Sequence, residues 1–135
     1  MIRSSRILVA LVATALFAIA GCGGGGDDKE KAEQTVREFV KAVNTRDADK
    51  YCDDLITEDF REKSTFATGA KASESCKREM RAITGLHIKL VRIVDAKVDG
   101  DTATVTAVLG RSGQELKQQL KLEKEDGDWK LAGTG

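Results

Sequence analysis

The sequence predicts an α+β fold in which N-terminal helices pack on one face of a curved four-stranded antiparallel sheet. Apolar residues recur every three or four positions before Gly85 and every second position after it, which is typical of helices followed by strands. Asp-Gly-Asp turns at 99–101 and 126–128 separate the alternating segments, as in β-hairpins. A chain of 135 residues has room for one such domain.

The N-terminal segment is predicted to be a targeting sequence and not part of the folded domain. Arg3 and Arg6 precede an uncharged apolar run from Ile7 to Ala20, which is shorter than the ~20 apolar residues of a membrane-spanning helix. Residues 1–21 are therefore interpreted as a signal peptide.

The end of this segment, Ile19-Ala20-Gly21-Cys22, resembles the lipobox of bacterial lipoproteins, in which the cysteine receives a diacylglyceryl group and becomes the mature N-terminus. We expect lipid on Cys22 to anchor the chain to the extracytoplasmic face of a bacterial membrane, in the cell envelope. Residues 22–30 then read as the lipidated cysteine and a glycine-rich tether, followed by one domain over 31–135. The alternative is secretory cleavage after Ala20, which leaves Cys22 as a free thiol.

Charge and composition exclude several classes of function. The 22 basic and 22 acidic residues balance, and removal of Arg3 and Arg6 with the signal peptide leaves a net charge of −2. Such a chain has no basic field for nucleic acid or for anionic lipid, so the lipid itself must bind the membrane. One histidine and three cysteines exclude a zinc finger or a multi-histidine metal site, and we expect no metal and no cofactor.

Helical periodicity covers the first half of the domain. We expect a helix over 29–44, a second helix capped by Asp47, and a short helical turn capped by Thr57. Residues 64–71 are predicted to be a loop, and Ser73 is expected to cap a last helix that ends at Gly85. The inward side chains of the second helix are expected to be Ala48, Tyr51, Cys52 and Leu55, and those of the last helix Cys76, Met80 and Ile83.

Two cysteines remain once Cys22 is assigned to lipid. Cys52 and Cys76 form an even pair in an oxidising compartment, so we predict a disulfide that joins two helices. Its loop of about 25 residues corresponds to ~3.5 kcal/mol in the chain-entropy model. The alternative is a pair of buried apolar thiols.

Four strands follow, each with one apolar face. Their apolar positions are Leu86, Ile88, Leu90, Val94, Ala96 and Val98, then Ala103, Val105, Ala107 and Leu109, then Leu116, Leu120 and Leu122, and last Trp129 and Leu131. Arg92 interrupts the first series and Gln118 the third. Either both face the interior, where they are candidate ligand contacts, or a bulge between Leu90 and Val91 turns Arg92 to water. His87 alternates with the apolar positions and is expected to point outward.

The order of elements resembles the nuclear transport factor 2-like superfamily, in particular its small bacterial lipoprotein members. The resemblance covers 31–131 and is carried by LITEDFR at 55–61, VDGDTATV at 98–105 and DGDWKL at 126–131. It implies a cone, with helices and a bent sheet around a pocket, and dimers formed through the sheet. Members of the superfamily include isomerases, dehydratases and ligand binders, so the fold does not choose the function.

Three functions remain open from the sequence. The first is a non-catalytic cone domain that binds a small apolar ligand or a protein partner, with Arg92, Gln118 and Tyr51 as candidate contacts; the absence of a paired acid and base favours it. The second is an interaction module that forms homodimers through its sheet. The third is an enzyme of isomerase or dehydratase type in which Tyr51 works with Asp53 or Asp54. No catalytic residue is assigned.

Overall fold

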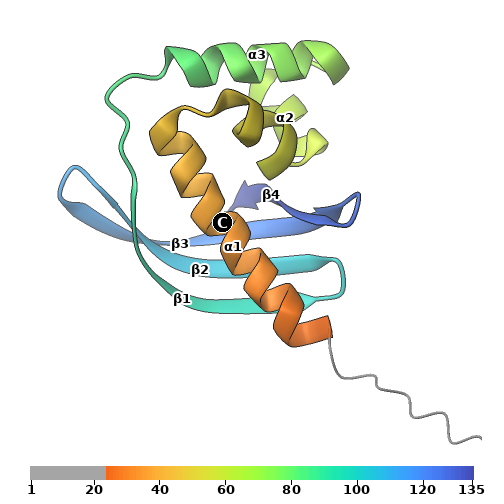
Figure 1. Ribbon diagram of the computed structural model, residues 1–135, viewed down its shortest axis with the longest axis vertical. Coiled ribbons are helices and arrows are strands. Elements are labelled where there is room, and N and C mark those ends of the chain that lie inside the picture. Colours follow the sequence, from red (N-terminus) through yellow and green to blue (C-terminus); the bar gives the residue numbers. More distant parts are fainter. Residues whose placement is uncertain (1–23) are drawn as a thin grey trace, which may run out of the picture.

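The computed structural model describes residues 24–135, and it confirms the predicted fold class. Helices lie on one face of a curved four-stranded antiparallel sheet, with the long first helix running diagonally across the strands (Figure 1). The signal peptide and Cys22 lie outside the described residues. Within 24–135, no helix is both long enough and apolar enough to cross a membrane.

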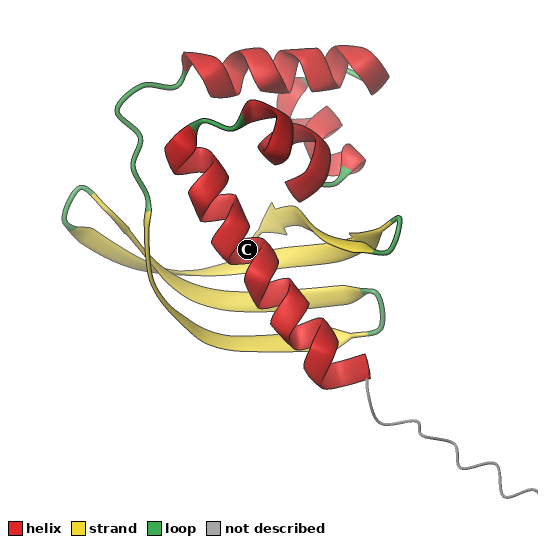
Figure 2. Cartoon of the chain, viewed as in Figure 1, coloured by secondary structure: helices red, strands yellow, loops and turns green. Residues whose placement is uncertain are grey.

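The helices come first in the chain and the strands follow as a meander in the order β1-β2-β3-β4 (Figure 2). The helical elements are α1 (Gly24–Thr45), the π-helical turn η1 (Lys50–Leu55), α2 (Glu58–Thr65) and α3 (Gly69–Ala82). The strands are β1 (Lys89–Asp99), β2 (Thr102–Arg111), β3 (Gln114–Glu125) and β4 (Asp128–Thr134). The Asp-Gly turns fall where the sequence predicts them, between β1 and β2 and between β3 and β4.

Helix α1 begins at Gly24, so residues 24–30 are helical and the predicted tether over 22–30 is wrong for this part. A contact distant in sequence explains the difference. The Asp28 carboxylate accepts hydrogen bonds from Lys124 Nζ, at 3.0 Å, and from Trp129 Nε1, at 3.2 Å. These bonds fasten the first turns of α1 to β3 and β4, which offsets the low helix propensity of the glycines.

The beginning of α2 agrees with the prediction, whereas the end of α2 and both ends of α3 differ from it. Thr57 caps α2 as expected, because its hydroxyl accepts from the Phe60 N–H. The predicted loop over 64–71 shrinks to 66–68, since α3 starts at Gly69 and not after Ser73. The Ser73 hydroxyl donates instead to the Asp53 carboxylate, at 2.8 Å, and this contact between helices replaces a cap.

Apolar side chains fill the space between α1 and the sheet. Val36 of α1 packs in one cluster with Val105, Leu120 and Leu122, all at most 1% exposed. Ile56, just after η1, joins the same cluster and forms a bridge to Leu131 on the outer edge of β4. The interior that the resemblance described as a pocket is thus occupied by packed side chains.

Strand β1 contains two irregularities that change its predicted faces. Its register against β2 shifts between Leu90 and Arg92 and again between Ile93 and Asp95. Arg92 is therefore exposed, and the alternative in which its guanidinium enters the interior is wrong. Val94, predicted to face inward, is 46% exposed, because the first shift turns Ile93 inward in its place and the second returns the inward position to Ala96.

Candidate functional site

A groove lies at the β2–β3 hairpin, at the end of the sheet where β3 extends beyond β4. Its volume is about 470 Å³. Three apolar side chains dominate it: Ile88 before β1, Leu109 at the end of β2, and Leu116 at the start of β3. Leu116 is 60% exposed, which is unusual for a large apolar side chain. We call this the hairpin groove; its other lining residues are Gly110, Arg111, Ser112, Gln114 and Gln118.

Local sequence explains the shape of the hairpin groove. Ser112 and Gly113 both have positive φ, at 51° and 81°, which is the requirement of a tight two-residue hairpin turn. The opposite wall is held by Asn44, near the end of α1. Its side-chain amide donates to the Ile88 carbonyl at 2.6 Å and accepts from the Ile88 N–H at 2.7 Å. Sequence reasoning missed Asn44, because only the fold brings it to Ile88.

The predicted ligand contacts separate in the structure. Gln118 is half-buried and lines the hairpin groove. Arg92 is exposed and does not line it. Tyr51 packs against Phe39, with ring centroids 5.5 Å apart, and burial raises the pKa of its hydroxyl. Tyr51 is thus part of the packing between η1 and α1, and of the three candidates only Gln118 lines this groove.

The aspartates that could serve Tyr51 as a partner are held by cations. Asp53 accepts a 2.6 Å bond from Lys77 Nζ and lies 3.8 Å from Arg61 Nη1. Burial alone raises the pKa of Asp53, but the bonds from Lys77 and Ser73 outweigh this effect and hold the pKa below its ordinary value. A carboxylate with a lowered pKa is a poor general base at neutral pH. Asp54 is exposed and lies 3.8 Å from Lys50 Nζ.

A disulfide lies beside this cluster of charges. Cys52 in η1 is bonded to Cys76 in α3, as predicted, with their Cα atoms 6.0 Å apart. The Cys52 carbonyl also accepts a 2.7 Å bond from Arg61 Nη1. The disulfide and the surrounding ion pairs together hold α3 against η1, so the role of this region is structural.

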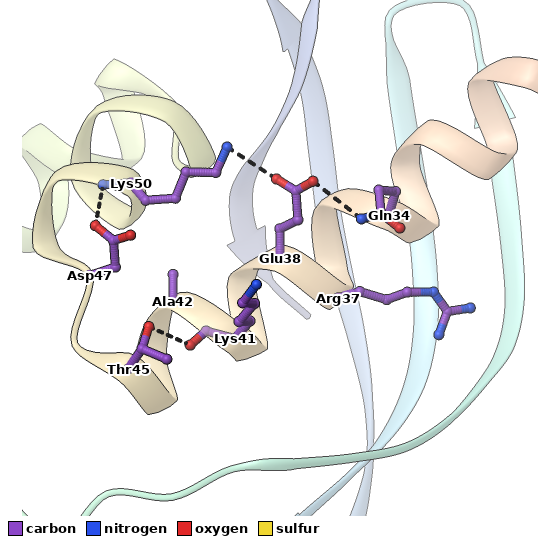
Figure 3. A pocket seen from close by; sticks show the side chains of 8 residues that line it. All are labelled: Gln34, Arg37, Glu38, Lys41, Ala42, Thr45, Asp47 and Lys50. Atoms are coloured by element: carbon purple, nitrogen blue, oxygen red, sulfur yellow. Dashed lines mark hydrogen bonds and ion pairs between the residues drawn. The ribbon is translucent and has the colours of Figure 1, made fainter.

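Two more grooves flank α1, and both are polar. The first, of about 370 Å³, runs along the C-terminal half of α1 toward η1 (Figure 3). Lys50 and Glu38 form an ion pair of 3.1 Å across it, and the Asp47 carboxylate accepts from the Lys50 N–H. The second, of about 540 Å³, lies between α1, η1 and β4 and is lined by charges of both signs. Lys50 of these grooves is paired with Glu38 and Asp54, and charged side chains prevail in both linings, so the more apolar hairpin groove is the stronger candidate for an apolar ligand.

The residues suited to metal ligation are dispersed. Among residues 24–135, no three His, Cys, Asp or Glu side chains are grouped to hold a metal ion. His87 is exposed, as predicted, and it lines a smaller groove of about 310 Å³ on the other side of the β2–β3 turn.

The fold and the site define an α+β domain with a packed interior, a disulfide clamp and an open apolar groove at one end of its sheet. A family model described as a domain of unknown function, DUF4878, matches residues 20–132, and the chain belongs to this family. No curated protein matches the chain.

Several solved structures are similar to the chain. A de novo designed protein with a curved β-sheet has a TM-score of 0.50 at 16% identity, over 76% of this chain and 95% of the other. A de novo designed protein of the NTF2 fold has a TM-score of 0.45 at 17% identity, over 78% and 84%. A "putative ketosteroid isomerase" from Kribbella flavida has a TM-score of 0.47 at 22% identity, over 78% and 77%. At these identities, similarity extends to the fold alone.

Proposed function

We propose that this protein is a lipid-anchored domain of the bacterial cell envelope that acts by binding, with the hairpin groove as its binding site. The observation that carries the proposal is the exposure of Leu116 beside Leu109 and Ile88, in a groove that four polar side chains also line. An exposed apolar groove with a small number of polar side chains is typical of a site for an apolar ligand or for an apolar segment of a partner. Gln118 and Arg111 supply the polar contacts.

The arrangement of the acidic residues favours binding over catalysis. Asp53 is engaged by Lys77 and Ser73, and Tyr51 is packed against Phe39. An enzyme of isomerase or dehydratase type needs a base within reach of a bound substrate. Among residues 24–135, no carboxylate and no tyrosine lines the hairpin groove.

Two features support the proposed location. Cys22 follows Ala20-Gly21 in the manner of a lipobox, after an apolar run of the length of a signal peptide. The Cys52–Cys76 disulfide is typical of a compartment outside the reducing cytosol. We expect Cys22→Ser to abolish incorporation of labelled palmitate and to release the protein from the membrane fraction. Unchanged partition would contradict lipid anchoring and leave the groove proposal intact.

Binding in the hairpin groove is tested with N-phenyl-1-naphthylamine, a neutral apolar dye that fluoresces on leaving water. We expect saturable binding by the parent protein and binding at least about tenfold weaker by Leu116→Gln, because burial of a leucine side chain corresponds to about 1.5–3 kcal/mol. Val94→Gln is the matched control, since Val94 is also exposed but does not line the groove. Equal affinity of the Leu116→Gln protein and the parent would contradict the proposed site.

A further inference from the structure

Strand β3 is longer than the strand that covers its outer edge. β4 pairs with β3 only from Leu120 to Glu125. The last bond on that side joins the Gly135 N–H to the Gln119 carbonyl, at 2.9 Å. From Gln114 to Gln118, β3 is paired with β2 alone. Within residues 24–135, this stretch is therefore an open strand edge, and it borders the hairpin groove.

The alternation of the backbone identifies the groups that this edge offers. In an antiparallel ladder, each residue directs its N–H and C=O to the same side, and successive residues alternate between sides. Because Gln119 directs its carbonyl toward β4, Lys117 and Glu115 direct their N–H and C=O groups to the same open side. The N–H groups of both residues would donate to a strand added here, and their carbonyl groups would accept from it.

The side chains on this edge are complementary to themselves. Glu115, Leu116 and Lys117 are all exposed. In an antiparallel pair of two identical edges centred on Leu116, Glu115 of each copy lies opposite Lys117 of the other, and the two leucines lie opposite each other. Pairs centred on Glu115 or on Lys117 instead place like charges opposite one another, which is destabilising. Among the registers centred on these three residues, charge therefore selects the one centred on Leu116.

The selected register also agrees with the hydrogen-bonding pattern. Glu115 and Lys117 both direct their backbone groups outward, so they form the hydrogen-bonded pair. Leu116 then falls in the non-hydrogen-bonded pair, where Cα atoms approach to about 4.5 Å and side chains are closest. Each leucine would cover the other and part of the facing hairpin groove. A charged edge normally discourages strand addition, but here each charge meets its opposite.

We propose that two copies of this chain associate through the open edge of β3, in antiparallel register centred on Leu116, so that each copy supplies the apolar side chain that covers the other's hairpin groove. The proposal rests on the proposed function in taking the groove as the binding site, and it names a second copy as the partner. The interface is short, and short interfaces bind weakly. Anchoring both copies in one membrane would raise their effective concentration.

The test uses the full chain in its membrane and traps even weak association as a disulfide. Directly opposite residues on paired strands have Cβ atoms about 4.5–5.5 Å apart, close to what a disulfide needs. We expect the Leu116→Cys protein to form a covalent dimer under mild oxidation with copper–phenanthroline. The Val94→Cys protein and the parent are expected to form no covalent dimer, and the parent also controls for the native cysteines.

Charge variants then test the register. Leu116→Cys/Lys117→Glu places Glu115 opposite a second carboxylate, and we expect dimer formation to fall at least fivefold. Adding Glu115→Lys exchanges the two charges and should restore it, which a mere folding defect would not permit. Absence of the Leu116→Cys dimer, or a dimer indifferent to Lys117→Glu, would overturn the proposal. Dye binding that depends on Leu116 together with no covalent dimer would refute the second copy and retain the groove.

Discussion

The bond between Cys52 and Cys76 should contribute a large share of the stability of this domain. It closes a loop with a sequence separation of 24 residues, joining the short turn η1 to α3. In the chain-entropy model, a loop of this length destabilises the unfolded chain by about 3.5 kcal/mol. Domains of this size have unfolding free energies of about 5–15 kcal/mol. The bond is all the more important because α3 packs chiefly on α2 and η1 and not on the sheet.

We expect Cys52→Ala/Cys76→Ala to lower the free energy of unfolding by about 3.5 kcal/mol, which corresponds to a fall in Tm of about 15 °C for a domain of this size. The measurement is urea and thermal denaturation followed by far-ultraviolet circular dichroism. A reducing agent should destabilise the parent protein by a similar amount and leave the double variant unchanged. A loss below about 1 kcal/mol, or equal sensitivity of both proteins to the reductant, would refute the reasoning.

Three more predictions follow from the packing and the charges. Leu120→Ala should cost about 2–5 kcal/mol in urea denaturation, because Leu120 is 1% exposed in the core; a smaller loss would mean that the interior is not closely packed. The bonds from Lys124 and Trp129 lower the pKa of Asp28, so its contribution to stability is present above about pH 4 and is lost as the pH falls below that value. Asp28→Asn should therefore speed hydrogen exchange over 26–32 at pH 7, and the difference from the parent should shrink on acidification; an unchanged exchange rate would contradict the fastening of α1. The lowered pKa of Asp53 predicts the same pH dependence of stability. We expect Asp53→Asn to lower the free energy of unfolding at pH 7 and to change it little near pH 3, and equal losses at both pH values would contradict this.

Local signals predicted the elements whose determinants lie within a few residues of each other. The turn at Asp99-Gly100-Asp101 and the Thr57 cap need no distant partner, and both are confirmed. The start of α1 could not be predicted, because the bonds of Asp28 reach across about a hundred residues. The π-helical form of η1 carries no signal in the sequence that we can identify.

The candidate site depends on the relative lengths of β3 and β4 more than on the types of residue in them. Alternation placed Leu116 on the same face as Leu120 and Leu122, but β4 and the core reach only Leu120, so Leu116 is exposed where burial was expected. The adjacent apolar pair at Leu90 and Val91 indicated the bulge that turns Arg92 to water, whereas nothing indicated the second irregularity near Val94. The two hydrogen bonds between the Asn44 side chain and the Ile88 backbone depend on the end of α1 lying against the segment before β1, which only the tertiary structure shows.

The start of α1 and the hairpin groove lie at opposite ends of β3. The first turns of α1 are fastened near Glu125, while the hairpin groove lies at Gln114, at the opposite end of the sheet (Figure 1). Only Gly23 separates the proposed lipid on Cys22 from the start of α1. A strand of 12 residues spans up to about 36 Å. The length of the folded domain, and not a flexible linker, would therefore separate the hairpin groove from the membrane surface.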